Sequence, residues 1–166
     1  MKISFLLLLV VIVFFDSTFV IQPSNSTISI SNGNQKFDST RDAKKDIRDA
    51  VNLAQKVHKR ILLDVGGDWC IWCHRLDSLF LQNKSLAEYL NRHYVVVKVN
   101  VSKENKNQEL LSTYPKVAGY PHLFVLDEHG TLLQSQDTGE LEYPKTYPIK
   151  GHDREKVSAF LKKWAQ

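Results

Sequence analysis

The chain of 166 residues contains only two cysteines, Cys70 and Cys73, and they stand three positions apart. Two cysteines with this spacing at the start of a helix lie on one face, at a Cα separation near the ~5.5 Å that a disulfide prefers. The first cysteine then sits where unpaired backbone N–H groups and the helix dipole stabilise a thiolate, while the second lies one turn further in and is more buried. The pattern predicts a redox-active dithiol.

The residues around the cysteines predict the elements that would position them. Residues 61–65 (Ile-Leu-Leu-Asp-Val) form a short apolar run that ends at Gly66-Gly67, which predicts a buried strand followed by a turn. After the cysteines, apolar residues continue at helical spacing at Trp72, Leu76, Leu79 and Phe80. We therefore expect the cysteines at the junction between a buried strand and a helix.

The rest of the sequence predicts an α/β domain. Apolar residues recur at three- and four-residue steps from Asp42 to near Arg60 and predict a helix, with Ser39 and Asp42 spaced as a capping box. Further elements are expected in chain order: a helical turn or two at 86–90, a central strand at 94–101, a short helix at 110–114, a hairpin of residues 122–126 and 131–133, and a helix at 157–164. This order predicts a mixed sheet flanked by helices.

These features resemble the thioredoxin superfamily, and the resemblance covers most of residues 42–166. The segment 61–73 resembles the active-site strand and turn of that family, and residues 76–101 are closer to bacterial periplasmic thiol:disulfide interchange domains than to cytosolic thioredoxin. The resemblance implies a thioredoxin-like α/β fold and protein thiol-disulfide oxidoreductase activity. Two departures leave the redox potential and the partner open: the dipeptide Ile71-Trp72 replaces Gly-Pro, and residues 136–152 form an insertion.

The resemblance also implies roles for the residues beside the dithiol. Cys70 is expected to be the exposed nucleophile and Cys73 the resolving thiol that breaks the mixed disulfide. Asp64 falls on the buried acidic residue of the family, and Lys98 falls on the lysine beside it. A buried Asp64 would take the proton from Cys73 as that thiol attacks, with Lys98 in support. The alternative is that Asp64 is an ordinary carboxylate at a strand end.

A third part of the resemblance concerns the segment Gly119-Tyr120-Pro121, which falls on the cis-proline of the family. Pro121 would face the cysteines and present the backbone of Tyr120 to an extended substrate. A plain trans turn proline is the alternative, since only about 5% of X–Pro bonds are cis. Trp69 and Trp72 either form an apolar rim for substrates or pack half-buried against the domain.

The first 21 residues differ in composition from the rest of the chain. Lys2 is followed by an apolar run from Phe5 to Phe15 and then by Asp16-Ser17-Thr18, which indicates a secretory signal peptide. The run is shorter than the roughly twenty apolar residues of a membrane span, but residues 3–21 could serve as an uncleaved membrane anchor. Either arrangement places the domain in the periplasm or elsewhere outside the cytoplasm, where disulfides persist.

Residues 22–41 are rich in Ser, Asn and Thr and predict a polar linker, with a short strand at 27–30 as an option, before a thioredoxin-like domain over 42–166. The net charge is +4, but Lys and Arg interleave with Asp and Glu without a basic stripe, so we expect no nucleic-acid partner. The expected partners are substrate proteins that carry disulfides or thiols and a membrane electron donor. We expect a monomer, and the carboxylate that helps Cys73 favours reduction over oxidation.

Other functions for the same residues have less support in the sequence. The sequence from Cys70 to His74 matches the C-x-x-C-H motif of covalent haem attachment, but the only methionine is Met1, so the distal ligand would have to be another histidine. Two cysteines and scattered histidines provide no zinc site, so we expect no metal and no cofactor. The stronger alternative is a permanent structural disulfide in a thioredoxin-fold binding or chaperone module, although a bridge across so small a loop constrains the unfolded chain little.

Overall fold

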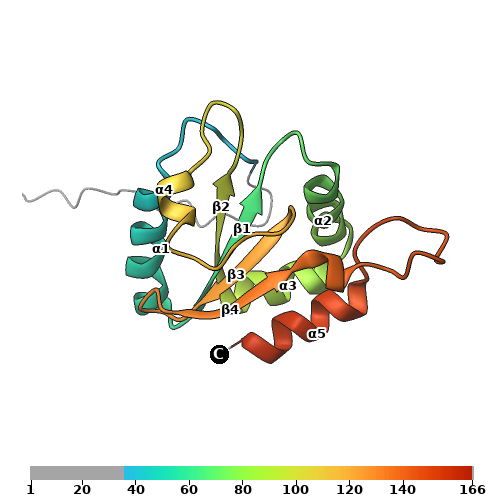
Figure 1. The fold of residues 1–166 in the computed structure, drawn as a ribbon. Helices are drawn as coiled ribbons and strands as arrows, with labels where there is room; N and C mark the ends of the chain where they lie inside the picture. Colours follow the sequence, from blue (N-terminus) through green and yellow to red (C-terminus); the bar gives the residue numbers. More distant parts are fainter. Residues whose placement is uncertain (1–35, 166) are drawn as a thin grey trace, which may run out of the picture.

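The computed structural model describes residues 36–165, in which helices cover both faces of a sheet (Figure 1). The elements in chain order are α1 (Ala43–Val57), β1 (Arg60–Gly66), α2 (Ile71–Gln82), α3 (Lys84–His93), β2 (Tyr94–Asn100), α4 (Gln108–Leu111), β3 (His122–Leu126), β4 (Leu132–Asp137), the 3₁₀ helix η1 (Thr138–Leu141) and α5 (Arg154–Trp164). None of these helices is long and apolar enough to cross a membrane. The predicted signal peptide and the strand at 27–30 lie outside the described residues.

The sheet is mixed, as predicted, with the strand order β2-β1-β3-β4. Strand β1 pairs in parallel with β2 and antiparallel with β3, and β3 pairs antiparallel with β4. The prediction that residues 94–101 form a central strand is wrong, because β2 lies at the edge of the sheet within the described part of the chain. All seven residues of β2 are nevertheless buried, since helices cover both of its faces, and the apolar pattern is therefore that of an interior strand.

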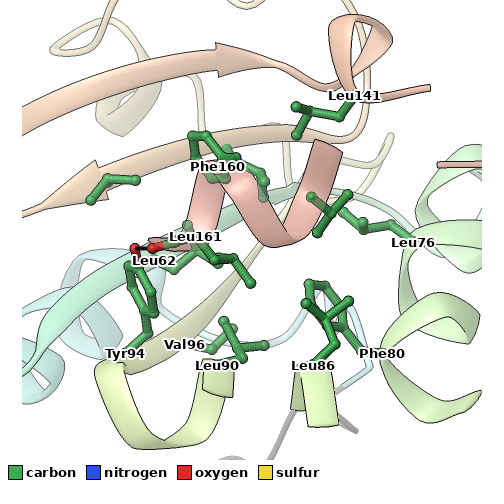
Figure 2. Packing of buried hydrophobic residues seen from close by; sticks show 13 residues of the cluster. Leu62, Leu76, Phe80, Leu86, Leu90, Tyr94, Val96, Leu141, Phe160 and Leu161 are labelled. Carbon is green, nitrogen blue, oxygen red and sulfur yellow. Dashed lines mark hydrogen bonds between the residues drawn. The ribbon is translucent and has the colours of Figure 1, made fainter. Parts of the chain in front are cut away.

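The two faces of the sheet are packed by different helices. Successive side chains of a strand point to opposite faces, so Ile61 and Leu63 contact the layer of α1 and α4, while Leu62 contacts the layer of α2, α3 and α5. Figure 2 shows the second layer, in which Leu62 and Val96 meet the helix residues Leu76, Phe80, Leu86, Leu90, Phe160 and Leu161. The hydroxyl of Tyr94 donates to the carbonyl oxygen of Leu161 at 2.7 Å, which ties β2 to α5.

Most element boundaries differ from prediction by a few residues, and two of the differences concern the start of α1 and the end of β4. Helix α1 begins with Asp42 as its N-cap, whose carboxylate accepts from the N–H of Lys45 at 3.0 Å, so Asp42 alone caps the helix and Ser39 does not take part in that bond. Strand β4 continues to Asp137, beyond the predicted end at 133, and η1 follows directly. The segment 136–152 therefore begins inside the hairpin instead of being wholly an insertion.

Candidate active site

The two cysteines lie at the carboxyl end of β1, where the turn 66–69 leads into α2. Cys70 is the N-cap of α2, and its sulfur is bonded to that of Cys73 across the first helical turn, with 5.2 Å between the Cα atoms. The backbone N–H of Cys73 donates to Sγ of Cys70 at 3.1 Å. Once the disulfide is reduced, this donor and the positive end of the helix dipole favour a thiolate on Cys70.

Both sulfurs are buried in the disulfide form. Cys70 is 4% exposed and Cys73 is 1% exposed, so the difference expected between an exposed nucleophile and a buried partner is small in this state. The side chains of Phe37, Trp72 and Tyr120 pack against the disulfide and account for its burial. A substrate that reacts at Cys70 must therefore reach a sulfur that aromatic side chains cover.

Phe37 is a site residue that sequence reasoning missed, because it lies in the segment predicted as a polar linker. A Cβ at Gly66 would stand 2.5 Å from Sγ of Cys73 and 2.9 Å from Cζ of Phe37, so the absence of a side chain at Gly66 lets the ring approach the disulfide. The ring also lies 4.4 Å from Nζ of Lys98. A single aromatic in a Ser- and Asn-rich stretch is the only sequence signal for this contact.

A buried ion cluster of three side chains lies on the face of β1 that Asp64 shares with Gly66, the glycine that Cys73 approaches. Asp64 of β1 and Lys98 of β2 are partners in the strand register, and Nζ of Lys98 donates to Oδ2 of Asp64 at 2.6 Å. Lys98 also donates to Oδ1 of Asp77, which projects from α2 and is mostly buried. The placement of Lys98 beside Asp64 is as expected, whereas Asp77 was not anticipated. Helical spacing places Asp77 one turn after Cys73, on the same face of α2, but does not indicate its contact with Lys98.

The cluster holds two carboxylates around one ammonium group, and burial together with this excess of negative charge shifts the pKa values of Lys98 and Asp77. Burial alone would lower the pKa of Lys98, but attraction to Asp64 and Asp77 outweighs burial and raises it. Burial raises the pKa of Asp77, and Lys98 offsets this only in part. Oδ1 of Asp64 has no hydrogen-bond partner within residues 36–165. Buried acceptors are normally paired, so an oxygen without a partner at this position is unusual.

The rim of the site is aromatic. The Tyr120–Pro121 peptide bond is cis, as the resemblance implied. Trp69 is 62% exposed, its indole N–H donates to the carbonyl oxygen of Val101 at 2.6 Å, and its ring meets Tyr120 edge to face with 5.7 Å between centroids. Trp69 is therefore held in place while most of its surface stays open to solvent.

Similarity to known proteins agrees with this geometry. A sequence profile described as thioredoxin-like matches residues 42–128. The chain belongs to this thioredoxin-like family. A disulfide bond reductase, DsbH, of Chlamydia pneumoniae is 33% identical over 94 residues, which are 51% of this chain and 56% of that protein. The thiol:disulfide interchange protein DsbD of Actinobacillus pleuropneumoniae is 29% identical over 85 residues, 51% of this chain but 14% of that protein. The thioredoxin-like chain thus spans only part of these relatives.

Solved structures place the thioredoxin-like protein in the same fold. A disulphide isomerase from Xylella fastidiosa Temecula1 superposes with a TM-score of 0.65 at 27% identity, over 78% of this chain and 96% of that chain. The oxidised C-terminal domain of DsbD from Neisseria meningitidis superposes with a TM-score of 0.55 at 17% identity, over 78% and 99% of the two chains, and supports the fold alone.

Trp72 connects the site of this thioredoxin-like protein to the segment before α5. It is half-buried, with the guanidinium of Arg75 4.4 Å above its ring and His152 edge-on at 5.9 Å between centroids. Burial lowers the pKa of His152 to about 4, so the imidazole is neutral at pH 7, and neither ring nitrogen has a hydrogen-bond partner within the described residues. Thr138 Oγ1 donates to the carbonyl oxygen of Pro121 at 2.5 Å. Residues 138–152 are thus anchored beside the disulfide at two points.

The C-x-x-C-H pattern is used differently from haem attachment. The two sulfurs that would carry haem are bonded to each other, and Nε2 of His74 lies 2.7 Å from the carbonyl oxygen of Asp68. Within residues 36–165, no group of three or more His, Cys, Asp or Glu side chains is placed to hold a metal ion. The chemistry that the arrangement provides is thiol-disulfide exchange.

Proposed function

We propose that this thioredoxin-like protein is an exported protein thiol-disulfide oxidoreductase that works as a reductase. The observation that carries the proposal is the Cys70–Cys73 bond across the first turn of α2, with a backbone N–H aimed at Sγ of Cys70. The names of the relatives, a disulfide bond reductase and a thiol:disulfide interchange protein, support the same activity. No cofactor is required, because the two thiols supply both electrons.

In the proposed reaction the thiolate of Cys70 attacks one sulfur of a substrate disulfide. This step forms a mixed disulfide and releases the first substrate thiolate. The thiolate of Cys73 then attacks Sγ of Cys70 and releases the second substrate thiolate, so that the substrate gains two electrons and the protein leaves with its own disulfide.

The second step requires that the thiol of Cys73 lose a proton. Asp64 is the proposed acceptor, since it is buried, its Oδ1 is unpartnered within residues 36–165 and its Oδ2 is held by Lys98. Lys98 is a positioning residue in this scheme, because it fixes the carboxylate without touching the substrate. Help of this kind from a general base is typically worth about a hundredfold or more in rate.

The proposed substrate contacts are the backbone of Tyr120, offered by Pro121 as in strand addition, and the exposed surface of Trp69. Trp72 contributes the part of its ring that is not covered by Arg75 and His152. Ile71, between the cysteines, is 58% exposed and adds apolar surface next to Cys70.

Export is proposed from the sequence of residues 1–21, because a positive start, an apolar run and a polar exit are typical of a signal peptide or an anchor. In an oxidising compartment a reductase must be reduced again after each cycle. We therefore propose a membrane electron donor as the second partner and a monomer as the working form.

The experiment that tests the activity is insulin reduction with single cysteine variants. We expect Cys70→Ser to abolish turnover and Cys73→Ser to accumulate mixed disulfides with insulin chains. If iodoacetamide at neutral pH modified Cys73 faster than Cys70 in the reduced protein, the assignment of roles would be wrong. A reduction potential below about −220 mV supports the reductase direction, whereas one near that of disulfide isomerases, about −180 mV, does not.

One observation favours a second candidate, a binding or chaperone module with a structural disulfide: both sulfurs are nearly inaccessible. A structural disulfide predicts that glutathione buffers leave the bond intact until the protein unfolds. The same potential measurement therefore separates the two candidates.

A further inference from the structure

A groove of about 920 Å³ opens beside the disulfide, at the carboxyl end of β2. Its apolar lining comes from Trp69, the segment after β2, α4 and the stretch that leads to the cis-proline: Val101, Leu111, Tyr114, Val117 and Tyr120. Figure 1 shows α4 and the loop after β2 at the same end of the sheet as the start of α2. The volume lies in the range of sites that take up a drug-sized ligand, which is room for several neighbouring side chains of a polypeptide.

The groove is continuous with the reactive pair. Trp69 directly precedes Cys70, Tyr120 packs against the disulfide, and the two rings touch edge to face. A polypeptide whose cysteine reacts at Cys70 would pass these two aromatics and place its neighbouring side chains in the groove.

The rim of the groove is basic. Lys103, Lys106 and Lys116 are exposed and line it, against a single acidic residue, Glu104. None of the three lysines takes part in an ion pair with a residue of the described segment 36–165. Their charges are thus left to attract an anionic partner at the edge of an apolar surface.

We propose that the groove selects substrate segments in which an apolar side chain next to the reacting cysteine is flanked by Asp or Glu. The proposal rests on the proposed function, because the segment is recognised while its disulfide is being reduced. Two other possible occupants of the groove complement the positive charge of its rim less well. Residues 17–35 of the chain contain no acidic residue, and a second copy of the chain carries a net charge of +4.

The test measures exchange between the reduced full-length protein and three peptides, each closed by one intramolecular disulfide with Leu beside a cysteine. The peptides differ only in two flanking residues, which are Asp, Ser or Lys. At low salt we expect rate constants in the order Asp, Ser, Lys, with about fivefold to tenfold between the extremes, and a smaller ratio in 0.5 M NaCl. Equal rates for the three peptides would overturn the proposal.

Charge-reversal variants locate the preference. The variant Lys103→Glu/Lys106→Glu/Lys116→Glu should reverse the order of the peptides. The matched control is Lys56→Glu/Lys84→Glu/Lys162→Glu, which changes the net charge equally at exposed positions outside the groove, and it should keep the order of the wild type. An equal loss of preference in both variants would show that the net charge of the protein causes the preference for acidic peptides, and would overturn the proposal that the groove selects them. Exchange rate constants that fall as the protein concentration rises would indicate that a second copy of the chain occupies the groove, and would also overturn the proposal.

Bis(2-hydroxyethyl) disulfide, a small uncharged acyclic disulfide, separates this proposal from the proposed function. If the protein exchanges with it but does not distinguish the peptides, only the groove proposal fails. If it exchanges with neither, both fail.

Discussion

The buried cluster of Lys98, Asp64 and Asp77 predicts that its members contribute unequally to stability. Replacing Lys98 by Met removes two attractions, to Oδ2 of Asp64 at 2.6 Å and to Oδ1 of Asp77, and leaves two carboxylates facing each other. Removing one partner of a buried ion pair costs about 3–5 kcal/mol. We expect Lys98→Met to lower the free energy of unfolding by that amount at pH 7.

Asp64→Asn leaves a different set of charges in the cluster. It removes one attraction to Lys98 but also the repulsion between the two carboxylates, and Lys98 keeps Asp77 as its counter-ion. The cluster then carries one positive and one negative charge. Since the lost attraction and the relieved repulsion oppose each other, we expect the free energy of unfolding to change by less than about 1 kcal/mol.

The assay is urea unfolding of the oxidised proteins at pH 7, with Lys56→Met as the control for loss of an exposed lysine. The control should stay within about 0.5 kcal/mol of the wild type. If Asp64→Asn cost as much as Lys98→Met, Asp77 would not compensate the charge of Lys98 and the reasoning would be refuted.

Insulin reduction adds a second readout for the same Asp64→Asn variant. Loss of the proton acceptor should slow turnover about a hundredfold or more while the fold keeps its stability. Unchanged turnover at unchanged stability would exclude Asp64 as the proton acceptor of Cys73.

Three further predictions concern packing around the site and in the core. Burial lowers the pKa of His152 from 6.5 to about 4, so the unfolded chain binds a proton at this residue before the folded protein does. The free energy of unfolding should therefore fall as the pH drops from 6.5 to 4, by up to about 3 kcal/mol. Urea unfolding of His152→Gln should show a correspondingly weaker pH dependence. In Phe37→Ala, iodoacetamide should modify reduced Cys73 faster than in wild type, whereas Phe37→Leu should protect it; equal rates in all three would mean that the ring does not shield the thiol. Tyr94→Phe removes the hydroxyl donor of the Leu161 carbonyl oxygen, which keeps the backbone N–H of Ala165, and should cost about 1 kcal/mol in the same unfolding assay. An unchanged value would show that the hydroxyl bond does not contribute to stability.

The local part of the site could be predicted from the sequence because its signals are short-range. The apolar run of β1, the Gly66-Gly67 turn and the helical spacing after Cys73 fix the strand, the turn and the helix that hold the dithiol. The cis bond before Pro121 and the pairing of Asp64 with Lys98 came from the resemblance to a family, since composition and spacing give neither.

The long-range contacts could not be predicted. Phe37 has no periodic neighbours, so nothing in its surroundings distinguishes a ring that packs on the disulfide from a solvated one. The contact of Asp77 with Lys98 depends on how α2 lies over the sheet, which helical spacing does not specify. Burial on both faces made β2 look like an interior strand, because an apolar pattern records coverage by helices and not the number of neighbouring strands.

The position of Phe37 has a practical consequence for anyone who trims this protein. Similarity to the family profile begins at residue 42, and a truncation chosen from that alignment would keep every strand and helix but remove the ring over the disulfide. Such a fragment would present Cys73 to solvent, and its measured redox properties would describe an uncovered dithiol. The side chains that cover the disulfide include Phe37, which lies ahead of the boundary that sequence similarity draws.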